Sequence, residues 1–325
     1  MKWGVAIAFA VGLVAAAWLI WAIGFDAVIG SVARAGFTGL AILCLYALLL
    51  TLPLAAAWVA LLPQDQRHGV KNFYLARLVR DCITEISPFS PVGGMVAAAR
   101  LVILHGMSAG YAAASVAADA TAEAMAQVAF LAIGILLGVG HFRHLAVAGP
   151  LINAMLITLV LAVPALAALI LLQKKGADFA ERVAARFFGE IKSGASFRDA
   201  IHELYASPRR LAVSSSLHLA SWIGGGGGTY IAFLLIGGKI SLPDAVAVEA
   251  LLCALRSIGA FVPAALGVQE AGYAMLAPLF GLPAEMGLAV SLLRRAREIV
   301  IGVPALLYWQ SAEAQAALRA RSTPP

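Results

Sequence analysis

The chain has 325 residues, of which 62% are hydrophobic and 12% are charged. Soluble domains carry about 25% charged residues, so this composition excludes a soluble globular protein. The net charge is +6, from 23 basic and 17 acidic residues. Because the basic residues form no patch interleaved with aromatic side chains, we also exclude nucleic acid as a partner.

Long apolar runs predict a polytopic membrane bundle, since a helix needs about 20 apolar residues to cross the hydrocarbon core. Six runs have this length, at residues 3–24, 37–62, 111–139, 145–172, 211–237 and 287–309. The first run is longer than the apolar core of a signal peptide, so we expect it to be retained as an anchor. Two other apolar stretches, 86–106 and 245–282, are interrupted by Pro and Gly. We expect broken or re-entrant helical hairpins there, which makes the predicted fold class an all-α integral membrane bundle.

The distribution of Lys and Arg predicts the orientation in the membrane. With a cytoplasmic N-terminus, fifteen basic residues fall on the cytoplasmic side, including Arg77 and Arg80, and three fall outside. Positive residues concentrate on the cytoplasmic side of membrane proteins, so we expect both termini in the cytoplasm. Residues 173–210 read as an amphipathic cytoplasmic linker that lies near anionic headgroups.

An internal repeat appears when the chain is laid over itself with an offset of 175 residues. Pro88 then falls on Pro263, Gly106 on Gly281 and Glu123 on Glu298, while the ionisable Asp119 falls on Arg294. The predicted repeat units are residues 37–139 and 212–314, with opposite orientations. Inverted repeats with broken helices are typical of secondary transporters, where the broken segments line the binding site. The helix weak points also correspond, because Pro53 falls on Gly228, the last of five consecutive glycines.

Charged residues in the apolar part of the chain are the candidate functional residues. They are Arg100, Arg256, Arg294, Arg295, Arg297, Asp119, Glu123, Glu249, Glu270 and Glu298. Each would cost about 2.5 to 3.5 kcal/mol at the bilayer centre, so they must pair, lie near an interface or line a wet cavity. Helical spacing predicts that Asp119 and Glu123 share one face, and that Arg294 and Glu298 do so as well. Internal ion pairing and a functional cavity both remain open; in a cavity, arginines suit a phosphate group.

The remaining sequence motifs do not indicate a metal site, a nucleotide site or a catalytic site. His141 and His144 lack co-ligands, and His218 reads as a satisfied core histidine, so we predict no metal site. The glycines 224–228 lack the Lys of a phosphate-binding loop, and close helix packing or an unwound hinge explains them better. No nucleotide-binding or nucleophile motif is present, and we predict no cofactor and no catalytic residue.

Two stretches resemble a known family. Residues 88–125, which begin with PFSPVGGMVAAARLVILHG, resemble its first motif, a Pro and a Gly-Gly followed by an Arg-containing helix and a Gly. Residues 254–310 resemble its second and more specific motif, with Val268-Gln269-Glu270 and Arg294 to Glu298. The family is the flippase-like group that includes the transmembrane domain of lysylphosphatidylglycerol synthases. The second motif is most similar to the hopanoid-biosynthesis-associated bacterial members, and the resemblance covers residues 5–310. Met95 departs from the pattern, since many relatives have an acid after the Gly-Gly.

The resemblance implies a bacterial inner-membrane protein that moves, or helps to export, an amphiphilic lipid. We expect one membrane domain over residues 1–310 and a cytoplasmic tail over 311–325. The synthases carry a soluble aminoacyl-transferase domain after the membrane part, whereas this chain stops at Pro325, so we do not expect an enzyme that aminoacylates lipid. The expected substrate-binding residues are Arg294, Arg297, Glu298, Gln269, Glu270, Gly267, Gly93, Gly94, Arg100, Arg256, Asp119 and Glu123.

Two alternatives belong to different functional classes. An intramembrane enzyme acting on a polyprenyl or hopanoid lipid would use Asp119 and Glu123 for acid–base chemistry. A non-catalytic scaffold would gather lipid-biosynthesis enzymes through the basic linker. The candidate partners are a membrane lipid, these lipid-biosynthesis enzymes and a second copy of the chain in a homo-oligomer.

Overall fold

The computed structural model describes residues 25–67, 69–86, 90–142, 148–175, 197–258 and 265–322. These residues form ten α-helices and two short 3-10 turns, and no strand occurs among them. The predicted all-α fold class is therefore confirmed. The first predicted span, 3–24, and residues 176–196 of the predicted linker lie outside the described residues.

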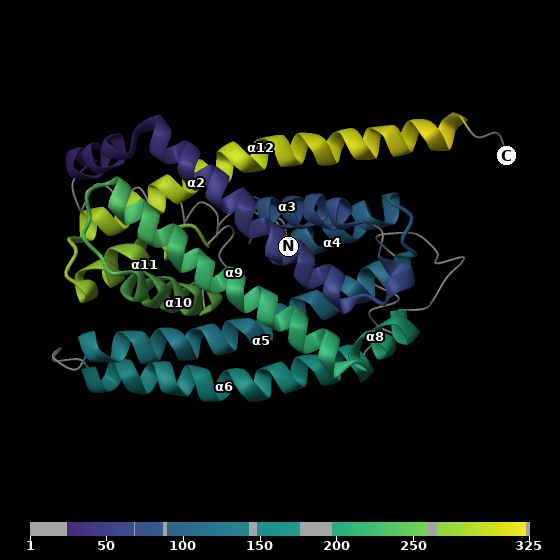
Figure 1. The fold of residues 1–325 in the computed structure, drawn as a ribbon, viewed down its shortest axis with the longest axis horizontal. Coiled ribbons are helices and arrows are strands. Elements are labelled where there is room, and N and C mark those ends of the chain that lie inside the picture. Colours follow the sequence, from purple (N-terminus) through teal and green to yellow (C-terminus); the bar gives the residue numbers. More distant parts are fainter. Residues whose placement is uncertain are drawn as a thin grey trace, which may run out of the picture. The chain divides into compact units, whose positions relative to one another are not determined.

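Figure 1 shows the helices in chain order. They are α2 (Phe25–Leu61), η1 (Gln64–Gln66), α3 (Val70–Ile86), α4 (Ser90–Leu104), α5 (Ala109–Phe142), α6 (Ala148–Lys175), α8 (Phe197–Tyr205), α9 (Pro208–Leu235), α10 (Leu242–Ile258), α11 (Val268–Leu276), η3 (Ala277–Phe280) and α12 (Ala284–Ser322).

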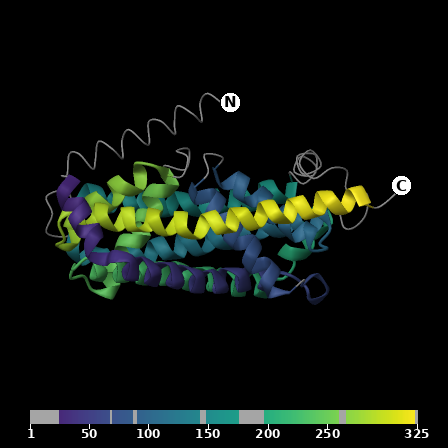
Figure 2. The same cartoon turned by 90° about the horizontal axis from the view of Figure 1, so that it is seen from above.

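Three of these helices are long and apolar enough to cross a membrane. The segments are Ala33–Leu61 in α2, Ala109–Gly140 in α5 and Leu156–Gln173 in α6, and each agrees with a predicted span. Two further predicted spans form the long helices α9 and α12, the latter drawn in Figure 2 as one long ribbon. Serines and glycines lower the hydropathy of α9, and residues 294–298 of α12 include three arginines and one glutamate.

The chain divides into two compact units, each with its own apolar core. One comprises Met1–Leu50, Ala126–Pro164 and Leu219–Ile299; the other comprises Thr51–Met125, Ala165–His218 and Val300–Pro325. In the former, Phe233 and Tyr273 are fully buried. In the latter, Trp58 and Phe73 are fully buried and meet edge to face, with ring centroids 5.2 Å apart.

The stretch 86–106 is more regular than its Pro and Gly residues suggested. Ser90–Leu104 is a continuous 15-residue helix, α4, which packs against α3 as a helical hairpin (Figure 1). Gly94 lies where the two backbones approach: a Cβ atom there would come within 2.5 Å of the Arg80 carbonyl oxygen. The glycine therefore permits close packing of two helices, as it does in other membrane bundles.

The second interrupted stretch also contains a helix pair. Leu242–Ile258 and Val268–Leu276 form α10 and α11, which pack against each other (Figure 1). An offset of 175 residues places α3 over α10, α4 over α11 and η3, and α5 over α12. The order of elements thus recurs in the chain, while the inverted orientation of the two repeats stays a prediction.

The turns before the long charged helices correspond in detail. Gly106 and Gly281 both have positive φ, at 104° and 76°. In each turn the residue after the glycine donates its amide to a carbonyl five residues earlier, Met107 to Val102 and Leu282 to Ala277. This is the pattern of a helix that ends at a left-handed residue, a conformation that glycine adopts without a Cβ clash.

The five-glycine segment of α9 is helical, which favours close packing over an unwound hinge. Tyr46 donates a hydrogen bond from its hydroxyl to the Gly224 carbonyl at 2.8 Å. A Cβ atom on Gly226 would lie 2.6 Å from the Cα of Val246. The glycines let neighbouring helices of this unit approach the α9 backbone.

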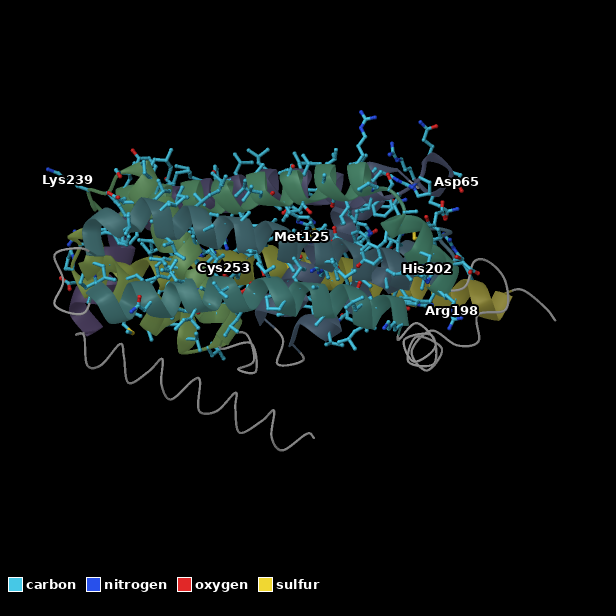
Figure 3. The ribbon with its side chains drawn as sticks, turned by 90° about the horizontal axis from the view of Figure 1, so that it is seen from below. Asp65, Met125, Arg198, His202, Lys239 and Cys253 are labelled. Atoms are coloured by element: carbon cyan, nitrogen blue, oxygen red, sulfur yellow. The ribbon has the colours of Figure 1, made fainter. Side chains whose placement is uncertain are left out.

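Helix α8 is the described part of the predicted linker that shows amphipathic character. Phe197, Ile201 and Leu204 are buried, whereas Arg198 and His202 are exposed on the same short helix (Figure 3). Tyr205 at its end donates to Thr121 Oγ1 at 2.8 Å, and burial raises the pKa of its hydroxyl above the ordinary value. The helix is thereby held against its own unit.

Candidate functional site: two buried ionic clusters

Each compact unit buries one group of charged side chains. The α5 cluster consists of Arg77, Arg80, Asp81, Asp119, Glu123 and His218. The α12 cluster consists of Thr229, Glu249, Gln269, Glu270, Tyr273, Ser291, Arg294, Arg295, Arg297 and Glu298. Corresponding helices of the sequence repeat, α5 and α12, carry the central charges of the two clusters.

In the α5 cluster, two arginines bridge two carboxylates. Arg77 reaches Asp119 at 3.0 Å and Glu123 at 2.6 Å, and Arg80 reaches both of them at 2.7 Å. Asp119 is fully buried and Arg77 is 3% exposed. The expected shared face of Asp119 and Glu123 is confirmed, because both contact the same two guanidinium groups. Such charge-assisted bonds offset the cost of removing four charges from water.

His218 joins this cluster from α9. Its Nε2 lies 3.0 Å from Asp119 Oδ1, and both side chains are fully buried. Its Nδ1 has no hydrogen-bond partner among the described residues. The interpretation of His218 as a satisfied core histidine is therefore wrong for one of its two ring nitrogens.

Arg77 and Arg80 are members of the cluster that the sequence did not single out as candidate site residues. Their count among the cytoplasmic bases stays a prediction, and the structure buries both side chains in α3. Thirteen cytoplasmic bases against three remain once these two are removed, so the charge bias still predicts the same orientation. Their spacing was an available signal, since residues three apart share a helix face and can meet carboxylates four apart.

In the α12 cluster, Arg294 is held by groups from three other helices. Its Nη1 donates to Glu249 of α10, to Tyr273 of α11 and, at 3.3 Å, to Thr229 of α9. The guanidinium carbon also lies 5.6 Å from the centroid of the Tyr273 ring, within cation–π range. This arginine therefore joins four helices of its unit.

The neighbouring arginines have different carboxylate partners. Arg295 contacts Glu270 at 3.0 Å and Glu298 at 3.2 Å, and Arg297 contacts Glu298 at 3.5 Å. The expected pair of Arg294 with Glu298 is replaced by the Arg294–Glu249 ion pair. Helical spacing brought Arg294 and Glu298 to one face, but carboxylates from other helices lie closer to the guanidinium group.

Glu270 and Gln269 are positioned by the start of α11. Gly267 precedes the helix with a φ of 78°, and Glu270 Oε2 accepts a hydrogen bond from its amide at 2.8 Å. Gln269 is fully buried and donates through Nε2 to Ser291 Oγ at 3.3 Å. The glutamate thus caps the helix while its other oxygen binds Arg295.

The chain matches the family described as Lysylphosphatidylglycerol synthase TM region over residues 5–305. The chain belongs to this family. A search of curated proteins and a search of solved structures gave no match. Membership and the apolar helices make the protein an integral membrane protein of a family related to lipid synthesis or translocation.

Both ionic clusters lie within the part of the chain matched by the lysylphosphatidylglycerol synthase TM region. In addition to Gly267, four expected site residues lie outside the clusters. Arg100 forms an ion pair with Glu313 at 3.0 Å, and both side chains are about one third exposed. Arg256 lies in the last turn of α10. Gly93 and Gly94 lie within helix α4, where Gly94 packs against α3.

The arrangement in this family member leaves specific hydrogen-bonding capacity unused. Arg294 Nε is a buried donor and Gln269 Oε1 is a buried acceptor, and neither has a partner in the described part of the chain. Buried polar groups are almost always hydrogen-bonded, so each of these atoms is available to ordered water or to a bound ligand. The α12 cluster can therefore offer a donor and an acceptor to a polar ligand.

Proposed function

We propose that this protein is an inner-membrane lipid translocase or export protein that binds the headgroup of an amphiphilic lipid at the α12 cluster. The observation that carries the proposal is the hydrogen bonding of Arg294. Its side chain is 12% exposed, and its Nε has no hydrogen-bond partner among the described residues. Two further arginines of the cluster lie on the same helix. Membership in a lipid-related membrane family supports this assignment.

The chemistry of the cluster favours an anionic group such as a phosphate. Three arginines and three glutamates balance one another, namely Arg294, Arg295, Arg297, Glu249, Glu270 and Glu298. A phosphate accepts bidentate hydrogen bonds from guanidinium groups, so it can take the place of a carboxylate. The desolvation cost makes buried ion pairs weak contributors to stability, which is compatible with exchange between two anionic partners.

In this proposal the expected site residues at the α12 cluster have definite roles. Arg294 and Arg297 bind the headgroup, and Glu270 and Glu298 hold arginines in place while the site is empty. Gln269 Oε1 accepts a hydrogen bond from a hydroxyl or amine of the same headgroup. Gly267 allows the chain to turn before α11, so that the amides at the start of the helix approach the ligand.

The decisive experiment measures lipid movement in liposomes that contain the purified full chain. Fluorescent phosphatidylglycerol with an NBD-labelled acyl chain is the probe, and dithionite destroys the label in the outer leaflet only. We expect movement with the native protein, and loss of most of the rate for Arg294→Gln, Arg297→Gln and Glu270→Gln. Arg209→Gln, an exposed charge at the start of α9, serves as the matched control.

Folding must be checked so that loss of movement is interpretable. Thermal unfolding of each variant in detergent shows whether it retains the native fold. Native rates in well-folded variants would contradict the assignment of the site. A deletion strain supplies an independent measurement: a depleted outer leaflet with unchanged total lipid supports translocation. A changed total lipid composition would favour the enzyme or scaffold alternatives instead.

A further inference from the structure

Helix α9 carries a row of buried polar atoms without protein partners. Arg210 Nη1, Ser214 Oγ and His218 Nδ1 have no hydrogen-bond partner among the described residues. Steps of four residues place these three side chains along one stripe of the helix. Ser214 and His218 are both fully buried. The indole Nε1 of Trp222, four residues further along α9, is also unpartnered.

Burial of such a row in a dry interior would be costly. A hydroxyl or ring nitrogen removed from water without a hydrogen bond costs about 1 to 3 kcal/mol in proteins. Ordered water is a common partner of buried polar groups that the protein leaves unsatisfied, and it needs two to four polar neighbours. The three atoms, spaced one turn apart, offer such neighbours in sequence. Pro208 and Arg209, at the start of the stripe, are exposed.

The inner end of the stripe is the basic nitrogen of His218. Its Nε2 lies against the Asp119 carboxylate, so the neutral ring places its proton on Nε2, which donates to Asp119. The lone pair is then on Nδ1, the atom that has no hydrogen-bond partner in the described part of the chain. The ring therefore presents its proton-accepting atom to the stripe.

The charged groups around the histidine come from α3 and α5. They are Arg77, Arg80, Asp81, Asp119 and Glu123. With a neutral histidine they carry two positive and three negative charges, and a proton on His218 brings the α5 cluster to electrical neutrality.

We propose that His218 is a proton-binding site, reached by water along the Arg210–Ser214–His218 stripe, and that it couples protons to lipid movement. The coupling rests on the proposed function, whereas proton binding does not. A hydronium ion in the stripe transfers its proton to Nδ1, water is released, and the imidazolium retains its Nε2 hydrogen bond to Asp119. Transfer back to water restores the neutral ring. The histidine contacts Asp119 Oδ1 while Arg77 and Arg80 contact Oδ2, so each proton adds a third positive charge beside one carboxylate that joins α3, α5 and α9.

Proton binding can be tested without any lipid assay. The full chain is labelled with ¹⁵N-histidine, placed in lipid nanodiscs and titrated by NMR from about pH 5 to pH 9, the range in which histidines change charge. His218→Gln assigns the signal, and His105→Gln, in the turn that follows α4, is the control. We expect a reversible titration of His218 Nδ1. A signal that stays unchanged until the protein unfolds would overturn the proposal.

The water path makes a separate prediction. Ser214→Ala removes the middle polar group, and we expect slower exchange of the His218 ring protons with water. Ser216→Ala is the control, because Ser216 is exposed on the same helix and bonds to the Ala212 carbonyl. Equal exchange rates in the two folded variants would contradict the path.

Coupling is then measured in the liposomes described above, with and without an imposed pH difference. We expect the pH difference to accelerate probe movement by the native protein, and His218→Gln to abolish the acceleration. If the probe moves at a rate independent of the pH difference, the coupling is wrong but the translocase assignment stands. If the native protein moves no probe although His218 titrates, the proposed function fails and proton binding stands.

Discussion

Arg77 and Glu123 are 46 residues apart in the chain, yet Arg77 Nη2 lies 2.6 Å from Glu123 Oε1 in the interior of one unit. The same arginine binds Asp119 and Asp81 through its other nitrogens. A single guanidinium group therefore connects three carboxylates from two helices. This connection explains how charged residues can lie in an apolar sequence without being exposed to lipid.

Loss of this arginine should destabilise the protein severely. Arg77→Gln leaves Asp119 and Glu123 with only one of their two arginine partners, and breaking a buried pair typically costs about 3 to 5 kcal/mol. We expect a marked decrease in the unfolding temperature in detergent. Lys71→Gln at the exposed start of α3 should change the free energy of unfolding by less than about 0.5 kcal/mol. Equal stability of the two variants would show that the α5 cluster is not formed.

The close contact of α3 and α4 predicts intolerance of a methyl group at Gly94. A Cβ atom there would lie 2.5 Å from both the Arg80 carbonyl oxygen and Thr84 Oγ1. Gly94→Ala should therefore destabilise the protein by about 1 to 3 kcal/mol through overpacking. Gly140→Ala is the matched control in a helix, because nothing lies within 4 Å of its Cβ position. Unfolding curves of the Gly94→Ala and Gly140→Ala variants, measured under the same conditions, test this difference in stability.

The two corresponding turns predict similar effects of alanine at Gly106 and Gly281. Nothing lies within 4 Å of a Cβ atom at either position, so the backbone alone determines the result. Alanine in the left-handed region costs about 1 to 2 kcal/mol. We expect a similar loss of stability from each substitution, whereas Gly30→Ala, in a helix with open space, should cause no loss. No loss of stability at either turn would argue against these backbone conformations.

Stability and lipid movement should separate at the Arg294–Glu249 pair. Arg294→Leu alone leaves Glu249 buried without its arginine, and we expect a loss of about 3 to 5 kcal/mol. The double variant Arg294→Leu with Glu249→Leu should recover most of this stability, because apolar replacement of a buried pair is often neutral. Lipid movement should remain lost in the double variant, since the headgroup-binding arginine is still absent. Recovery of both properties would mean that the pair is only structural.

The positions of the helices along the chain were largely predictable, because helix formation depends on local properties of the sequence. The apolar runs 37–62, 111–139 and 145–172 correspond to membrane-length helices, since hydropathy and helical periodicity are read over neighbouring residues. The interrupted stretch 86–106 was less predictable. Pro91 and the Gly-Gly pair suggested a break, but helix α4 begins at Ser90 and tolerates both features in its first turn and against α3.

The candidate site was predicted only in part, because its pairings are non-local. The sequence by itself determined that Asp119, Glu123, Arg294 and Glu298 must be neutralised or hydrated, since charge at membrane depth is costly. It could not identify Glu249 as the partner of Arg294, or Arg77 and Arg80 as the partners of Asp119 and Glu123. Such partners are separated by tens of residues, and only the packing of helices brings them within hydrogen-bonding distance. The composition therefore determined a membrane bundle with buried charge, and the tertiary structure decided which charges meet.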